Sequence, residues 1–218
     1  MTQILGAVCL LTATSVVLAG AQQYEPLSAS VRAVLHRSVA DNAAPRLAFE
    51  DEFDGQVWLA DMSARLERFI SDKNARRDFL ITVHYEATRA GLDPQLVLAV
   101  IQVESAFRKY AISRAGARGY MQVMPFWLKV IGDEQEHNLF YLRTNLRYGC
   151  TILRHYLDIE RGDLFRALGR YNGSLGKAKY PNLVRRVLAR NWEYETDPAV
   201  KPVKGESKPT SPAEPRKM

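Results

Sequence analysis

The chain has 218 residues, of which 47% are hydrophobic and 25% are charged. That composition is typical of a soluble globular protein with one sizeable core, and it excludes a chain that is disordered throughout. The net charge of +6 and the isoelectric point of about 9.4 favour an anionic partner, which could be nucleic acid, acidic lipid or an acidic wall polymer. The sign of the charge does not choose among these.

The first 21 residues are largely apolar and contain no charged side chain. An apolar run, Ile4–Leu11, resumes at Val16–Leu18 and is followed by the small residues Ala19–Ala21, which resemble a signal-peptidase site. We therefore expect residues 1–21 to be the signal peptide of an exported, periplasmic protein, with a short membrane anchor as the alternative. Removing this leader would leave Cys150 as the only cysteine, so no intramolecular disulfide is expected.

The rest of the chain divides by composition into three parts. Residues 22–55 form an N-terminal extension, a linker or a peripheral helix, with one weak helical pattern around Val31 and Leu35. Residues 56–192, with a core at 72–190, show helical periodicity almost throughout. Residues 193–218 are rich in Pro, Lys, Ser and Glu and predict a disordered tail. We expect an all-α fold with helices at Gln56–Ile70, Asn74–Ala90, Pro94–Ser105, Gly119–Val130, Tyr141–Asp158, Asp163–Tyr171 and Lys177–Arg190.

The helix predicted at Pro94–Ser105 carries the first candidate functional residue. Its segment Leu96–Ile101 is apolar on every face, so the helix should run through the centre of the domain. Glu104 then lies at the C-terminal end, where burial and the helix dipole both disfavour a negative charge and raise the pKa. A carboxylic acid that is protonated near neutral pH can act as a general acid. An ion pair with Arg108 or Lys109 is the alternative, and position alone favours it.

Two further segments are weak signals taken singly. The small residues and two arginines of 113–119 precede Tyr120–Pro125, and glycines there would let the backbone approach a bulky ligand. Tyr171-Asn172-Gly173 closes a predicted helix, which is more often a simple cap than a binding element. The histidines have no ligand-like spacing, so neither a metal nor a cofactor is expected.

Taken in order, these segments resemble the catalytic domain of the soluble lytic murein transglycosylase family. The resemblance covers about residues 72–190 and rests on Glu104-Ser105-Ala106-Phe107, Ser113, Gly116–Pro125, Asn145 and Tyr171-Asn172-Gly173. It implies a lysozyme-like fold of about seven helices, with Glu104 as the catalytic acid and base. The residues that it implies for substrate binding are Ser105, which would also support the helix end, Ser113, Met121, Gln122, Asn145, which would precede the next core helix, Tyr171 and Asn172.

The sequence departs from the family pattern in two places. Tyr120 stands where the family often has Leu, and Tyr180–Val184 occupies a stretch where many members have a Glu-Thr pair, so no second carboxylate is assigned. Asp93 cannot be the partner because it begins the helix that Glu104 ends, about 16 Å away at about 1.5 Å per residue.

The resemblance implies non-hydrolytic cleavage of peptidoglycan glycan strands to 1,6-anhydro ends by a metal-free, monomeric enzyme. Wall or secretion-complex proteins would contact the extension or the tail. A hydrolase like the goose-type lysozymes and an inactive wall-binding factor are the alternatives. A nucleic-acid binder would rest only on a basic face at Arg185, Arg186 and Arg190, for which solvent exposure is the simpler explanation.

Overall fold

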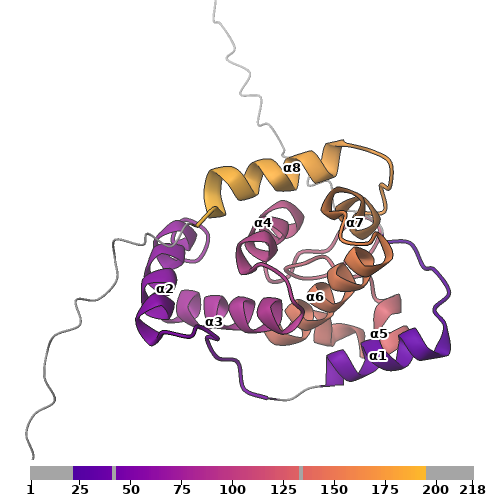
Figure 1. Cartoon of the computed structure of the whole chain (residues 1–218), viewed down its shortest axis with the longest axis horizontal. Helices are drawn as coiled ribbons and strands as arrows, with labels where there is room; N and C mark the ends of the chain where they lie inside the picture. Colours follow the sequence, from indigo (N-terminus) through magenta and orange to yellow (C-terminus); the bar gives the residue numbers. More distant parts are fainter. Residues whose placement is uncertain (1–21, 41–42, 133–134, 195–218) are drawn as a thin grey trace, which may run out of the picture.

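The computed structural model describes residues 22–40, 43–132 and 135–194 (Figure 1). The expected signal peptide, residues 1–21, and nearly all of the expected tail lie outside the described residues. Within the described residues, no helix combines the length and the apolar character that crossing a bilayer requires.

The prediction of an all-α fold is confirmed. Among residues 22–40, 43–132 and 135–194, β-structure is limited to two isolated bridges, Ile112 with Arg118 and Arg118 with Val123. A short 3-10 helix, Glu136–Phe140, precedes α6, and a π-helical turn, Leu188–Trp192, follows α8. The α-helices are α1 (Ala29–Ala40), α2 (Glu52–Leu66), α3 (Lys73–Arg89), α4 (Pro94–Ser105), α5 (Phe126–Ile131), α6 (Leu142–Ile159), α7 (Leu164–Tyr171) and α8 (Lys179–Val187).

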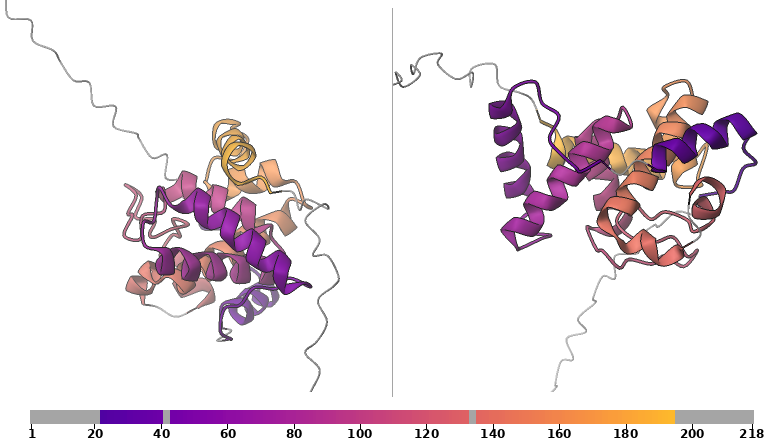
Figure 2. Two further views of the ribbon diagram at one scale, coloured as in Figure 1. Left: turned by 90° about the vertical axis from the view of Figure 1, so that its left-hand side faces the viewer. Right: turned by 90° about the horizontal axis from the view of Figure 1, so that it is seen from below.

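Helix α4 occupies the centre of the domain, between α3 and α8 (Figures 1 and 2). It begins where predicted because the Asp93 side chain accepts a hydrogen bond from the Gln95 amide at 2.8 Å and Pro94 fills the first turn. The continuous apolar segment Leu96–Ile101 is buried on all sides. The helix ends at Ala106, whose left-handed backbone (φ 49°) turns the chain away directly after the Glu104-Ser105 pair.

A buried cluster of charges fixes α1 to the rest of the domain. Glu86 of α3 is fully buried and lies 3.0 Å from Arg89, 3.5 Å from Arg143 and 3.0 Å from Arg147. Arg89 and Arg147 also donate hydrogen bonds to backbone carbonyls near the C-terminal end of α1, at 2.6 and 3.3 Å. The weak helical pattern of the extension therefore corresponds to a peripheral helix, α1, which is held by hydrogen bonds from Arg89 and Arg147.

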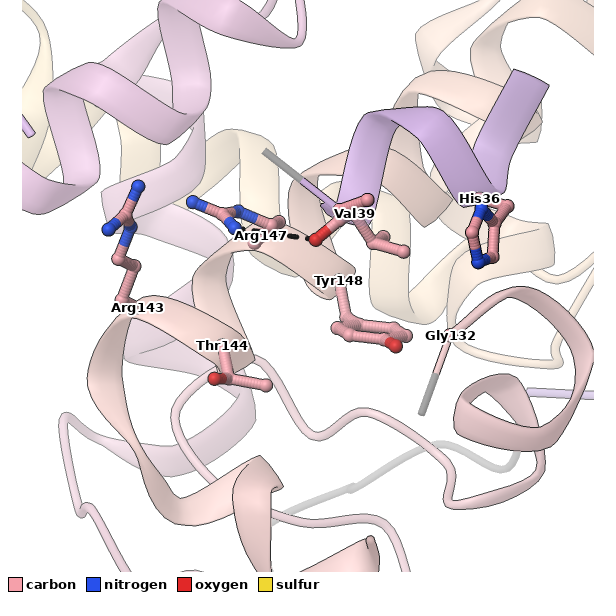
Figure 3. Close-up of a pocket in the computed structure, with 8 residues that line it drawn as sticks. His36, Val39, Gly132, Arg143, Thr144, Arg147 and Tyr148 are labelled. Carbon is pink, nitrogen blue, oxygen red and sulfur yellow. Dashed lines mark hydrogen bonds between the residues drawn. The ribbon is translucent and has the colours of Figure 1, made fainter. Parts of the chain in front are cut away.

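Two of these arginines, Arg143 and Arg147, line a pocket of about 450 Å³ between α1 and α6, which also contains His36 and Tyr148 (Figure 3). The charges of this pocket are paired with Glu86 and the α1 backbone. We therefore interpret it as a structural joint between helices.

The predicted helix Gly119–Val130 is wrong for its first seven residues. Residues 119–125 form a loop, and α5 begins only at Phe126. Gly119 (φ 75°) and Gln122 (φ 50°) adopt left-handed backbone conformations that no right-handed helix accommodates. Backbone hydrogen bonds between Arg118 and Val123, at 2.9 and 3.0 Å, hold this loop closed.

Other boundaries moved by a few residues. Helix α2 starts at Glu52 rather than at Gln56 because Asp51 caps it, with the Phe53 amide donating at 2.8 Å. Helix α8 starts at Lys179 rather than at Lys177.

Candidate active site

Glu104 lies at the C-terminal end of α4 with only 2% of its surface exposed. Its Oε1 accepts a hydrogen bond of 2.5 Å from the Tyr180 hydroxyl, while its buried Oε2 has no hydrogen-bond partner among the described residues. The two candidate cations have other partners: Arg108 donates to the Ser105 carbonyl at 3.0 Å, and Lys109 lies 5.1 Å from the centre of the Tyr110 ring. The simple structural ion pair that position alone favoured for Glu104 is therefore not what the structure shows.

Burial determines the protonation of this pair. It raises the pKa of Glu104 to about 8, against an opposing effect of the hydrogen bond from Tyr180. Burial also raises the pKa of Tyr180 well above its usual value, so the phenol keeps its proton and donates a hydrogen bond to Glu104 Oε1. Oε1 accepts the hydrogen bond from the Tyr180 hydroxyl. The acid proton of Glu104 is therefore placed on Oε2, the oxygen that has no hydrogen-bond partner among the described residues.

A buried hydrogen-bond network holds the loop of residues 119–125 in place. The Met121 amide donates to Asn145 Oδ1 at 2.7 Å, and Asn145 Nδ2 donates to the carbonyls of Arg118 and Leu139, each at 2.8 Å. The Tyr171 hydroxyl, from the end of α7, donates to the Met121 carbonyl at 2.7 Å. Asn145 thus anchors the loop. We expected Asn145 to precede the next core helix, but it lies within the first turn of α6.

Two glycines permit this close packing. A Cβ on Gly119 would lie 2.4 Å from both Asn145 Nδ2 and the Leu139 carbonyl oxygen, and one on Gly149 would lie 2.4 Å from Met121 Sδ. Any larger residue at either position would push the loop away from its anchor.

Of the eight predicted site residues, Glu104, Met121, Gln122, Asn145 and Tyr171 belong to one buried cluster, which is joined by hydrogen bonds and by the influence of Glu104 on the pKa of Tyr171. Asn172 is the C-cap residue of α7, next to Tyr171, and is 6% exposed.

Three of the predicted substrate-binding side chains bond to the protein itself. The Gln122 amide donates to the carbonyls of Ala111 and Gly119, at 3.1 and 2.9 Å. The Ser105 hydroxyl donates to the Ile101 carbonyl within α4, which suits the support of the helix end. Ser113 closes a small turn by accepting a hydrogen bond from the Ala117 amide at 3.0 Å.

Two residues of the cluster escaped the sequence analysis. Tyr180 was noted only as the first residue of the stretch in which many family members have a Glu-Thr pair, although it is the direct partner of Glu104. Gln22, in the extension, is 4% exposed, and its side chain reaches the backbone of Gln122 and Met124. No local signal marks Gln22, because it meets residues 100 and 102 positions away.

Potential metal ligands do not gather at this site. Across the described ranges, no three His, Cys, Asp or Glu side chains come together in a way that could hold a metal ion. His84 lies between the rings of Phe49 and Trp58, and burial lowers its pKa to about 4, so it is a neutral core residue.

An all-α domain with a buried carboxylic acid at the end of its central helix has the architecture of a lysozyme-like fold. The family model of the transglycosylase SLT domain matches residues 82–189, which include Glu104, the loop, Asn145, Tyr171 and Tyr180. Over these residues the chain is similar to the SLT transglycosylase family.

Curated relatives agree with the family model. Membrane-bound lytic murein transglycosylase C of Haemophilus influenzae (strain PittEE) is 29% identical, over 57% of this chain and 46% of its own length. The transglycosylase of Enterobacteria phage PRD1 is 34% identical, over 45% of this chain and 36% of its own length. In both cases the match covers less than half of the relative.

Proposed function

We propose that the protein is a peptidoglycan lytic transglycosylase. It would cleave the β-1,4 bond between N-acetylmuramic acid and N-acetylglucosamine without water and leave 1,6-anhydro-N-acetylmuramic acid ends. The observation that carries this proposal is the state of Glu104: a buried carboxylic acid with a pKa raised to about 8, one oxygen held by Tyr180 and the other without a hydrogen-bond partner among the described residues.

In the first step, Glu104 Oε2 would donate its proton to the bridging oxygen as the bond to the anomeric carbon breaks. The substrate's own acetamido group would stabilise the positive charge that develops at that carbon. In the second step, the carboxylate would take the proton of the sugar's 6-hydroxyl while that oxygen bonds to the anomeric carbon. The proton returns to Glu104, and no water is consumed.

A single carboxylate suits this route better than a hydrolytic one. Hydrolytic glycosidases generally place two carboxyl groups about 5–9.5 Å apart. Here the hydrogen-bond partner of the Glu104 carboxyl group is the Tyr180 hydroxyl and not a second carboxyl group. Tyr180 instead supplies a neutral hydroxyl that fixes the carboxyl group in place.

Peptidoglycan lies outside the cytoplasmic membrane, so the proposal requires export. The apolar residues 1–21 would serve as the leader. We further propose that the enzyme acts as a periplasmic monomer on glycan strands, and that any wall or secretion-complex partner contacts the N-terminal extension or the tail.

The test is a digest of purified peptidoglycan with mass analysis of the released muropeptides. The proposal expects products one water lighter than the corresponding reducing-end fragments, no release by Glu104→Gln, and normal release by Glu50→Gln, which alters an exposed carboxylate. Reducing-end products would identify a hydrolase. Glycan binding without any release by the unmodified protein would identify a wall-binding factor.

A further inference from the structure

The chain segment before α1 lies against the catalytic cluster. We call residues 22–28 the strap. In Figure 1 this indigo segment leaves the N-terminal end of α1 and runs up toward α7. Its downstream end is fixed because α1 is held by the arginines around Glu86. The strap is therefore tethered beside the site and meets it at a high effective concentration.

Three contacts hold the strap across the site. Glu25 pairs with Arg170 of α7 at 2.7 Å. The Tyr24 ring packs edge-on against Phe126, the first residue of α5, with ring centres 5.7 Å apart. Beyond Tyr24, Gln22 is buried against the backbone of Gln122 and Met124. The strap thus bridges α7, whose Tyr171 donates a hydrogen bond to the loop, and α5, which follows the loop.

The Gln22 side chain makes the contacts of a bound amide. Its Oε1 accepts a hydrogen bond from the Met124 amide at 3.2 Å, and its Nε2 approaches the Gln122 carbonyl oxygen at 3.5 Å. The same side chain also hydrogen-bonds to Tyr171, whose hydroxyl holds the Met121 carbonyl. A carbonyl facing a backbone N–H and an N–H facing a backbone carbonyl are the groups that an acetamido substituent of an N-acetyl sugar presents.

The acid itself is closed off in this arrangement. Glu104 is 2% exposed and Tyr171 is 1% exposed, yet a general acid must come within hydrogen-bond distance of the oxygen that it protonates. A segment must therefore move before a sugar can reach Glu104. The strap is the part of the described extension that inserts a side chain into this cluster.

We propose that the strap is an autoinhibitory segment, in which the Gln22 amide occupies the place of a substrate acetamido group and a glycan strand must displace it. This inference rests on the proposed function. A strap that is closed about nine-tenths of the time weakens the apparent affinity for glycan about tenfold, because only the open fraction binds. Loosening the strap should therefore tighten glycan binding.

The experiment measures binding of a β-1,4-linked N-acetylglucosamine pentamer by calorimetry, with the full chain carrying Glu104→Gln so that the ligand is not consumed. Gln22→Ala and, in the middle of the strap, Glu25→Gln should each lower the Kd, the first by about tenfold. Gln23→Ala, which alters the exposed neighbour of Gln22, is the matched control and should bind like its parent. A parallel NMR titration follows the side-chain NH2 signals of Gln22, which should move to the positions of an exposed glutamine when glycan is added.

Each other outcome has a distinct meaning. Equal affinity of parent and Gln22→Ala, or NH2 signals that do not move on glycan binding, would overturn the strap proposal and leave the proposed function intact. Weaker binding by Gln22→Ala would overturn it as well, since Gln22 would then help to hold the substrate. Failure of all variants to bind glycan, with folding intact by circular dichroism, would overturn the proposed function and with it this inference.

Discussion

Replacing Glu104 with Gln should stabilise the folded protein at neutral pH. Below about pH 8 the folded state keeps a proton on this buried acid, whereas the unfolded chain keeps it only below its ordinary pKa of 4.5. Between these values the folded state binds more protons, so stability falls as pH rises, by about 1.4 kcal/mol per pH unit. The cost to the wild-type protein is about 3 kcal/mol at pH 7 and about 5 kcal/mol above pH 8.

The amide that Glu104→Gln introduces cannot ionise, so the variant avoids that cost, and the carbonyl oxygen of the amide can still accept the hydrogen bond from Tyr180. Urea unfolding followed by circular dichroism at pH 5, 7 and 9 measures the free energy of unfolding of both proteins. The advantage of Glu104→Gln should grow from below about 1 kcal/mol at pH 5 to about 3 kcal/mol at pH 7. Glu50→Gln, at an exposed site, should show no such growth.

A difference between wild-type and Glu104→Gln protein that stays constant from pH 5 to pH 9 would refute this reasoning. It would mean that Glu104 titrates alike in the folded and unfolded states, and that burial does not control its proton.

Three further predictions concern the surroundings of Glu104 and the joint at α1. Tyr180→Phe removes a hydrogen bond that lowers the pKa of Glu104, so the alkaline limb of the pH–activity profile should move to higher pH. The variant's kcat should fall about tenfold because the carboxyl group is no longer fixed in place. An alkaline limb that does not move would show that the Tyr180 hydroxyl does not affect the acid. Gly119→Ala should lower the free energy of unfolding by about 2–4 kcal/mol in thermal unfolding, because the added Cβ meets Asn145. Gly116→Ala, which has a similar φ and open space around it, should lower it by only about 1–2 kcal/mol. Equal losses would contradict the packing argument. Glu86→Ala leaves Arg89 and Arg147 without their carboxylate and should lower the free energy of unfolding in urea by about 3–5 kcal/mol. A loss below about 1 kcal/mol would rule out a structural role for this charge cluster.

Local signals were enough to predict α4. Asp93 and Pro94 mark its start, and an apolar run that no surface helix tolerates marks it as central, so the position of Glu104 at its buried end followed from the sequence. The helix predicted at Gly119–Val130 failed because tertiary contacts decide that segment. The hydrogen bonds of Asn145, 24 residues away from Met121, hold Gly119 and Gln122 in conformations that local periodicity does not reveal.

The partners of Glu104 lay beyond the reach of pattern reading for a similar reason. Tyr180 reaches the acid across 76 residues of sequence, and Gln22 reaches the Gln122 backbone across 100. The resemblance assigned no second carboxylate near residue 180, and only the packing of α8 against α4 shows that Tyr180 contacts Glu104. The catalytic role of Glu104 remains a prediction, as do the substrate-binding roles of Ser105, Ser113, Met121, Gln122, Asn145, Tyr171 and Asn172.

The central claim is that Glu104 holds its proton at neutral pH, and an NMR titration of its side-chain carboxyl carbon tests this most directly. The signal is assigned by its loss in Glu104→Gln. The account predicts a midpoint near pH 8, set by burial against the hydrogen bond from Tyr180. A midpoint near the ordinary value of 4.5 would contradict it, because an acid that is ionised at neutral pH has no proton to give to a glycosidic oxygen.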